Sequence, residues 1–128
     1  SREDFEICAT AQVVVTDDRS AVLEMIKPHL ALYMGGMGAE DTNFHADVYR
    51  RMGYSEVVDD VTKLFRADRK DEAAKVIPDE LVDDIHIIGE AGKVKERVAA
   101  WEEAGVTTLL LSCRTPEEVR QIAEVVLG

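Results

Sequence analysis

The sequence predicts an α/β fold with parallel strands, and three observations lead to this prediction. Residues 107–112 form an apolar, strand-like run, followed at once by a helix start and an apolar stripe at helical spacing. A second strand-like run, 85–88, precedes a helix-type segment that leads into the first run. Near the N-terminus, residues 5–16 alternate with period two, as a half-buried strand does. Strands separated by helices pair in parallel, because the crossover returns the chain to the same end of the sheet.

The strand predicted at residues 5–16 has one apolar and one largely polar face. The apolar face carries Phe5, Ile7, Ala9, Ala11, Val13 and Val15, and the other carries Glu6, Cys8, Thr10, Gln12, Val14 and Thr16. Asp17 or Asp18 can cap the helix that follows. The stripe of that helix is Val22, Leu23, Ile26, Leu30 and Tyr33, and Pro28 within it predicts a kink or a restart.

Residues 35–84 contain no alternating stretch and are predicted to be helical. Helical spacing of apolar residues predicts a helix over 54–65 and a short one over 71–76, and Pro78 can open another through Leu81 and Val82. We expect residues 1–128 to be a single segment with this helical insertion in its middle.

Residues 85–128 are predicted to run strand, helix, strand, helix. Val94, Val98 and Trp101 share one face of the helix over 93–104, and Gly105 follows where a helix usually stops. Core packing is the default role of Trp101, with a subunit interface as the alternative.

The start of the last helix has a local signature of its own. Thr115 can cap it, Pro116 suits the first helical position, and Glu118 can return a hydrogen bond to the N–H of the cap.

Composition limits the classes of function. The 128 residues are 46% hydrophobic, which suffices for one globular core, and no apolar run approaches the roughly 20 residues that span a bilayer. A net charge of -11 opposes binding to nucleic acid or to anionic membranes. Cys8 and Cys113 lack disulfide density and CxxC spacing, so reduced thiols in a cytoplasmic protein are expected. The chain starts at Ser1 without a signal peptide or an initiator Met, which suggests a processed or excised segment.

Common catalytic and binding motifs have little support. Residues 35–38 (GGMG) follow a helix rather than a strand and lack GxGxxG spacing, which disfavours dinucleotide binding. We expect a helix end with a turn that needs positive φ, and the functional alternative is a lid over a substrate. His29, His45 and His86 are dispersed without zinc spacing, so no metal site is predicted. No serine lies in a GxSxG turn and neither cysteine has an evident partner base, so no catalytic residue is assigned.

Three strands leave sheet edges and apolar faces that a parallel architecture normally covers. The chain is therefore expected to join partner chains as a homo-oligomer, to swap elements, or to close its core with the middle helices.

Several segments of the chain resemble one family nearly from end to end. They are residues 5–18 (FEICATAQVVVTDD), 32–38 (LYMGGMG), 43–44 (NF), 53–54 (GY), 69–74 (RKDEAA), 78–82 (PDELV) and 104–112 (AGVTTLLLS). Together they resemble the C-terminal part of the luciferase-like, coenzyme F420-dependent oxidoreductases, the methylenetetrahydromethanopterin reductase-like group.

The resemblance implies the C-terminal portion of a TIM (β/α)8 barrel, with about three β-α units and a helical insertion. Residues 5–16, 85–88 and 107–112 would be the sixth, seventh and eighth strands. Coenzyme F420, or alternatively FMN, would exchange a hydride with a small-molecule substrate, and most cofactor contacts would come from the absent strands. Barrel sites lie at the C-terminal ends of strands, so Thr10, Gln12 and Arg114 are the candidate residues of the substrate pocket.

Ordinary roles stand beside these candidates. Thr10 and Gln12 also fit polar positions on a half-exposed strand, and Arg114 fits a surface arginine. The segment alone is not expected to be catalytic, and the alternative function is a non-catalytic, self-associating α/β module.

Overall fold

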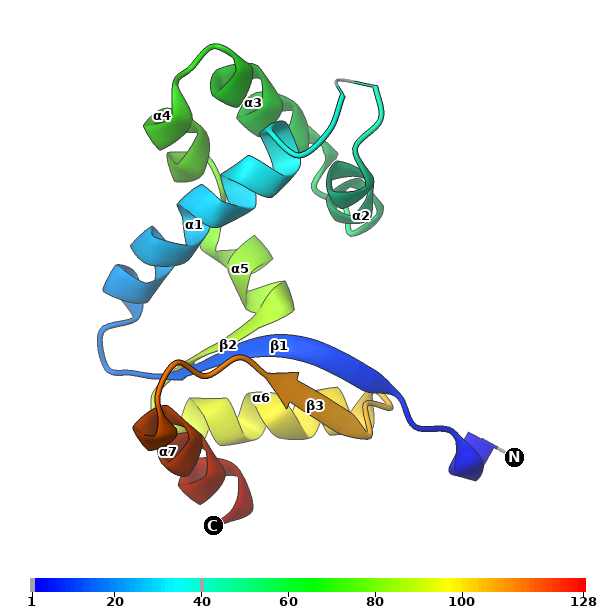
Figure 1. Cartoon of the computed structure of the whole chain (residues 1–128), viewed down its shortest axis with the longest axis vertical. Helices are drawn as coiled ribbons and strands as arrows, with labels where there is room; N and C mark the ends of the chain where they lie inside the picture. The colour runs from blue at the N-terminus through cyan, green and yellow to red at the C-terminus, as the bar shows by residue number, and fades with distance from the viewer. Residues whose placement is uncertain (1, 40) are drawn as a thin grey trace. The chain divides into compact units, whose positions relative to one another are not determined.

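The computed structural model describes residues 2–39 and 41–128 (Figure 1). The chain packs into two compact units. Unit 1 contains the residues up to Arg19 together with residues 85–128, and unit 2 contains residues 20–84. Unit 1 is therefore discontinuous in sequence, with unit 2 inserted between its first strand and its second.

Unit 1 holds the sheet. After a 3-10 turn at Arg2–Asp4, its elements are β1 (Cys8–Val15), β2 (His86–Gly89), α6 (Ala91–Glu103), β3 (Thr108–Leu111) and α7 (Pro116–Leu127). All pairings in the sheet are parallel, which confirms the predicted α/β class.

The strand order is β2-β1-β3, so β1 is central (Figure 1). The C-terminal half of β1 pairs with β2, from Gln12 with His86 to Val15 with Gly89. Its N-terminal half pairs with β3, from Cys8 with Thr108 to Ala11 with Leu111. Consecutive strands of a (β/α)8 barrel are neighbours, so the sixth, seventh and eighth strands would place β2 in the centre. In this chain β3 occupies instead the second edge of β1.

One face of the sheet carries the core of unit 1. Val13, Ile87, Val94 and Ile122 are buried together there, and half-buried side chains of α6, α7 and β3 pack around them. Val98 and Trp101 belong to this cluster, as the helical pattern predicted. Helices α6 and α7 therefore cover the face of β1 that the odd-numbered residues form.

The helix ends of unit 1 follow local rules. Gly105 has a φ of 105°, its N–H donates to the carbonyl of Glu102, and the N–H of Val106 donates to that of Trp101. This pair of hydrogen bonds is a Schellman motif, which fits the predicted stop of α6.

Helix α7 begins with the predicted cap. The Thr115 hydroxyl accepts a hydrogen bond from the N–H of Glu118 at 3.2 Å. The Glu118 carboxylate accepts from the N–H of Arg114 at 2.6 Å, one residue before the expected donor. This bond comes first among the causes that lower the pKa of Glu118, and the N–H of Thr115 makes the smallest contribution.

Unit 2 is built of helices. They are α1 (Arg19–Gly35, whose first residue belongs to unit 1), α2 (Phe44–Arg51), α3 (Ser55–Arg66), α4 (Lys70–Lys75) and α5 (Asp79–Ile85, whose last residue belongs to unit 1). Helix α1 continues through Pro28, so no restart occurs there. The helices expected over 54–65, over 71–76 and after Pro78 correspond to α3, α4 and α5, whereas α2 was not predicted.

The glycines after α1 are required for space rather than for positive φ. Helix α1 ends at Gly35 and a turn follows, as predicted, but among the described glycines only Gly53, Gly89 and Gly105 have positive φ, so the positive φ expected at residues 35–38 is wrong. A Cβ on Gly35 would lie 2.6 Å from Cβ of Phe65, and one on Gly36 would lie 2.7 Å from Cε1 of the same ring. The Phe65 side chain of α3 would therefore have to shift to make room for a Cβ at either of these two positions.

Two further observations bear on the class of protein. Within the described residues, no helix is both long and apolar enough to cross a membrane. Cys8 is exposed and Cys113 is half-buried, and both thiols are free.

Candidate functional site

The uncovered face of the sheet carries the predicted pocket residues. Side chains alternate across a strand, so the even-numbered residues of β1 point away from the face that α6 and α7 cover. Thr10 and Gln12 are two of these residues, and their strand partners are Leu110 and His86. The face opposite the helices is thus partly polar, as the wall of a small-molecule pocket requires.

Thr10 and Gln12 are available for a ligand. Thr10 is exposed and Gln12 is half-buried. Neither side chain has a hydrogen-bond partner among the residues that the structure describes. Both lie before the C-terminal end of β1, as its third and fifth residues.

His86 is a neighbour of Gln12 that the sequence did not predict. The two residues are directly opposite each other in the register of β1 and β2. The sequence alone does not reveal this pairing, because the pairing depends on which strand lies beside β1 and on the register of the two strands. An imidazole beside a carboxamide adds a titratable group to the uncovered face.

Arg114 follows β3 and is mainly exposed. Its guanidinium lies 3.3 Å from the Glu118 carboxylate, and 71% of its side chain is accessible to solvent. This ion pair between the residue before the cap of α7 and its first turn fits a surface role of Arg114, and no described contact joins Arg114 to Thr10 or Gln12.

The C-terminal ends of β1 and β2 are fastened to each other. The N–H of Thr16 donates to the carbonyl of Gly89 at 2.9 Å, and the Arg19 guanidinium donates to the carbonyl of Ile88 at 3.1 Å. The Thr16 hydroxyl also accepts from the N–H of Asp18 at 3.0 Å. These bonds fix the edge of the sheet at which parallel α/β proteins bind ligands.

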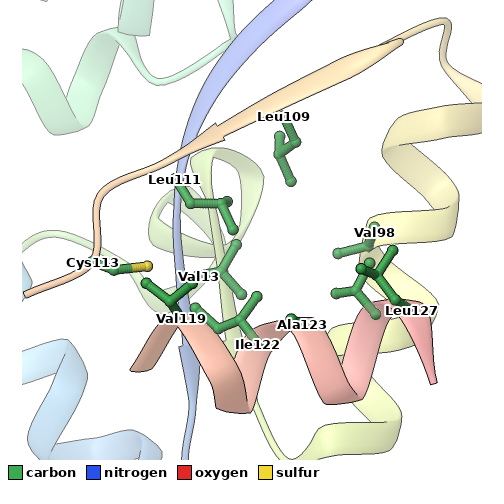
Figure 2. Close-up of a pocket in the computed structure, with 10 residues that line it drawn as sticks. Val13, Val98, Leu109, Leu111, Cys113, Val119, Ile122, Ala123 and Leu127 are labelled. Atoms are coloured by element: carbon green, nitrogen blue, oxygen red, sulfur yellow. The ribbon is translucent and has the colours of Figure 1, made fainter. Parts of the chain in front are cut away.

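A groove lies in unit 1 between the sheet and α7 (Figure 2). Its volume is about 510 Å³. The lining is apolar apart from one thiol: Val13, Val98, Leu109, Leu111, Cys113, Val119, Ile122, Ala123, Val126 and Leu127. Figure 2 shows the side chains of β3 and α7 facing each other across this space. No charged group lines it, so the groove suits apolar contacts rather than catalysis.

Unit 2 brings together aromatic side chains that the sequence leaves apart. The rings of His29 and His45 lie 4.7 Å and 4.6 Å from that of Tyr33, measured between centroids. His29 and Tyr33 are four residues apart on α1, a spacing visible in the sequence, whereas His45 depends on the turn before α2. Burial raises the pKa of Tyr49, and the charge of Tyr33 raises it further.

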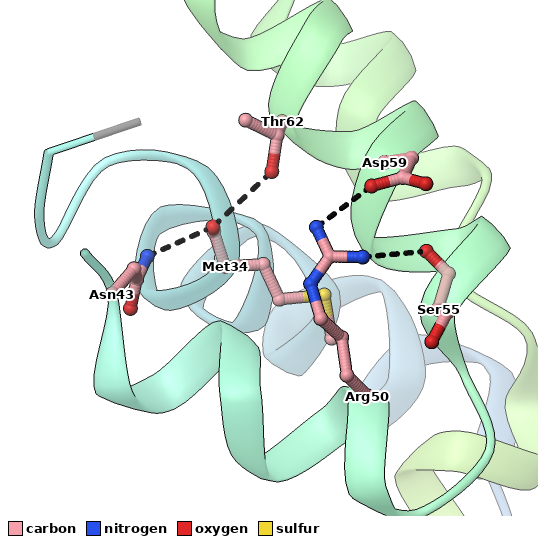
Figure 3. Close-up of polar contacts among 6 residues, drawn as sticks. All are labelled: Met34, Asn43, Arg50, Ser55, Asp59 and Thr62. Atoms are coloured by element: carbon pink, nitrogen blue, oxygen red, sulfur yellow. Dashed lines mark hydrogen bonds and ion pairs between the residues drawn. The ribbon is translucent and has the colours of Figure 1, made fainter. Parts of the chain in front are cut away.

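Asn43 holds the start of α2 against the end of α1. Its side-chain oxygen accepts from the N–H groups of His45 and Ala46, and its amide donates to the carbonyls of Tyr33 and Met34 at 3.0 and 2.9 Å. Figure 3 shows Thr62 of α3 reaching the same Met34 carbonyl at 3.4 Å.

Two further polar contacts connect elements of unit 2. Arg50 of α2 donates to the Asp59 carboxylate at 2.7 Å and to the carbonyl of Ser55 at 3.4 Å (Figure 3). The Tyr54 hydroxyl donates to Asp84 at 2.6 Å, and this hydrogen bond is the main cause that raises the pKa of Tyr54 to about 12. These groups are engaged with each other, and no group of three metal-ligating side chains occurs in residues 2–39 and 41–128.

Comparisons with known proteins point to one family. Residues 1–108 match the family described as luciferase-like monooxygenase. The chain is 67% identical over 126 residues to a protein of Mycobacterium tuberculosis (strain ATCC 25618 / H37Rv) named "Putative coenzyme F420-dependent oxidoreductase Rv3520c". The match covers 98% of this chain and 36% of that relative, so the chain spans about a third of the relative's length.

Proposed function

The chain belongs to the luciferase-like monooxygenase family, and on this premise we propose that it is the C-terminal part of a cytoplasmic, coenzyme F420-dependent oxidoreductase. One observation carries the proposal: 67% identity over nearly the whole chain to a protein named for this cofactor. FMN is the alternative cofactor. When bound, a deazaflavin takes up or gives back a hydride, so the substrate is oxidised or reduced by two electrons.

The proposed contribution of this chain is one wall of the substrate pocket. Thr10 and Gln12 lie on the uncovered face of the sheet without hydrogen-bond partners among the described residues, so they can bind polar groups of a small substrate. Arg114 is the third candidate, for an anionic group, and it would first have to leave Glu118.

Among the described residues, the arginines that follow β1 and β3 are already engaged with other groups. Arg19 donates to a carbonyl at the end of β2, and Arg114 is paired with a carboxylate. The net charge of -11 also repels anions. We therefore propose that the cofactor contacts, and the groups that move protons, come from the rest of the protein.

Cofactor binding by the complete protein tests this proposal. The test protein is the M. tuberculosis relative in which this chain replaces the matching 126 residues. We expect this chimera to bind F420 in a fluorescence titration, and the isolated chain to bind neither F420 nor FMN. Stoichiometric binding of F420 by the isolated chain would contradict the assignment of the cofactor site to the missing residues.

A pair of matched substitutions tests the pocket wall. In the chimera, Gln12→Leu should raise KM for the substrate by about tenfold, because a carboxamide that binds a polar group is lost, and leave F420 binding unchanged. Gln121→Leu is the control, since this residue is exposed on α7. Equal KM values for the two variants would remove Gln12 from the pocket.

A non-catalytic, self-associating module is the second candidate function. The observation in its favour is the exposure of apolar residues on β3 and α7, where Leu110 is 52% and Leu127 is 83% exposed. Sedimentation of the isolated chain over a range of concentrations separates the candidates. A mass that rises to a defined homo-oligomer, together with a chimera that binds neither F420 nor FMN, would favour the module.

A further inference from the structure

Strand β3 lies where a complete barrel would place another strand. Each strand of a (β/α)8 barrel lies between the strands that precede and follow it in sequence. One neighbour of β1 is β2, which follows it, and the other would be the strand that precedes it. In this chain β3 pairs with that second edge, and the outer edge of β2 is unpaired within the sheet.

The pairing of β3 with β1 is as long as that of β2 with β1, but its start is exposed. It covers four residues on each strand. At its start, the N–H groups of Thr107 and Thr108 both donate to the carbonyl of Ile7, and the Thr108 hydroxyl donates to Glu6 at 2.5 Å. Water competes for exposed hydrogen bonds of this kind, so they contribute little to holding β3 in place.

The packing beneath β3 is incomplete. Helix α6 packs on β2 and β1, and α7 packs on β1 and α6, but β3 and α7 do not pack closely against each other. The apolar groove of Figure 2 lies between β3 and α7. The run Thr108-Leu-Leu-Leu111 is typical of a strand buried on both faces, yet Leu110 and Leu111 are 52% and 38% exposed.

From these observations we propose that β3 with α7 is a movable edge unit. In the chain by itself, β3 protects the second edge of β1. When the rest of the barrel is present, β3 yields that edge to the strand that precedes β1 and moves to the outer edge of β2. The occupant is thus an apolar parallel strand from the part of the family's barrel that this chain does not match. This inference rests on the proposed function only in assuming a barrel.

A disulfide between β1 and β3 tests the exchange. Cys8 and Thr108 are register partners, and neighbouring strands lie about 4.8 Å apart, within the Cα separation of about 4.4–6.8 Å that a disulfide bridges. The variant is Thr108→Cys with Cys113→Ser, which removes the other thiol. Its matched control adds Cys8→Ser and cannot form the bond.

The isolated chain and the chimera should differ clearly in disulfide formation. On mild oxidation, the isolated variant should lose its two free thiols, as counted by alkylation under denaturing conditions. In the chimera the same thiols should remain free, because β2 would separate the two strands. Equal cross-linking in the isolated chain and in the chimera would overturn the exchange.

Cofactor binding is measured on the same chimera, so the two proposals fail separately. A chimera that cross-links and binds F420 keeps the proposed function and rejects the exchange. A chimera that is folded, as judged by circular dichroism, but keeps its thiols reduced and binds no cofactor supports the exchange and rejects the F420 assignment.

Amide exchange in the isolated chain gives an independent test that does not need the chimera. The N–H groups of Thr107 and Thr108 should exchange about tenfold or more faster than that of buried Val94, which donates to the Glu90 carbonyl at 2.9 Å. Exchange as slow as that of Val94 would show that β3 is firmly held, and would contradict a movable edge unit.

Discussion

The two edge strands of the sheet have similar sequences and very different surroundings. β2 (HIIG) and β3 (TLLL) are both short, apolar and parallel to β1. On the face that the helices cover, Ile87 of β2 is 0% exposed, whereas Leu111 of β3 is 38% exposed. The difference lies in the helix that follows each strand, because α6 packs on β2 and α7 leaves a groove under β3. The burial of an apolar strand therefore depends on the helix that packs against it, and not on its own sequence alone.

The largest expected effect comes from truncating each edge strand in turn. Ile87→Ala should lower the free energy of unfolding by about 3 kcal/mol, because a fully buried side chain leaves a cavity. Leu111→Ala should cost about 1–2 kcal/mol, since Leu111 faces the groove and more than a third of it is already exposed to water. Urea denaturation of both variants measures the difference, and equal losses would mean that β3 is as well covered as β2.

Enlarging an alanine distinguishes an open groove from a closed core. Ala73→Leu in α4 should cost about 1–3 kcal/mol, because Ala73 is fully buried and extra atoms overpack its site. Ala123→Leu should stabilise the chain by about 0.5–1 kcal/mol, since this residue lines the groove and the added carbons lose contact with water. Thermal unfolding reports both signs. A destabilising A123L would show that the groove has no room.

The N-terminal caps give the opposite order, because α7, which packs loosely against β3, has a stronger cap than α6. Thr115→Ala should cost about 1 kcal/mol, because the Thr115 hydroxyl accepts the N–H of Glu118 at the start of α7. Glu90→Ala should change stability by only about 0.2 kcal/mol, since the cap of α6 makes no side-chain hydrogen bond. Chemical denaturation in parallel measures both. If E90A cost as much as T115A, the cap of α6 would be stronger than its geometry indicates.

The smallest expected effect concerns pH at the start of α7. The hydrogen bond from the N–H of Arg114 holds the pKa of Glu118 below its ordinary value of 4.5. A lowered pKa in the folded state means that ionised Glu118 stabilises the fold above pH 4.5, and that this contribution is lost as the pH falls through the folded value. Glu118→Gln should therefore be less stable than the parent at pH 7, and the gap should close in acid. Glu117→Gln is the control, and a gap that persisted at low pH would point to packing instead.

Local chemistry made most elements predictable. The cap at Thr115 and the stop at Gly105 depend on neighbours within a few residues, so the sequence showed both ends correctly. The strand at β1 was evident because Ala11 and Val13 alternate with Thr10 and Gln12. Helix α2 was missed because only Ala46 among its residues is buried, which leaves no apolar stripe to recognise. Its one local signal is Asn43, which caps it.

Features that depend on distant contacts were not predictable. The glycines after α1 were explained by φ, but Phe65, about thirty residues away, is the reason for them. The neighbour relation of Gln12 and His86 depends on register, and the place of β3 depends on which edge is free. Thr10, Gln12 and Arg114 remain predictions as pocket residues, and Arg114 is paired with Glu118.

The discontinuity of unit 1 has a consequence for the order of folding. Pairing Gln12 with His86 closes a long loop, and closing a flexible loop of this length costs about 4 kcal/mol of chain entropy. If residues 20–84 fold first, their two ends are already at a fixed separation and most of this entropy is spent before the strands meet. The helical insert then acts as an internal template for the sheet, and we expect substitutions that destabilise it to slow the refolding of unit 1.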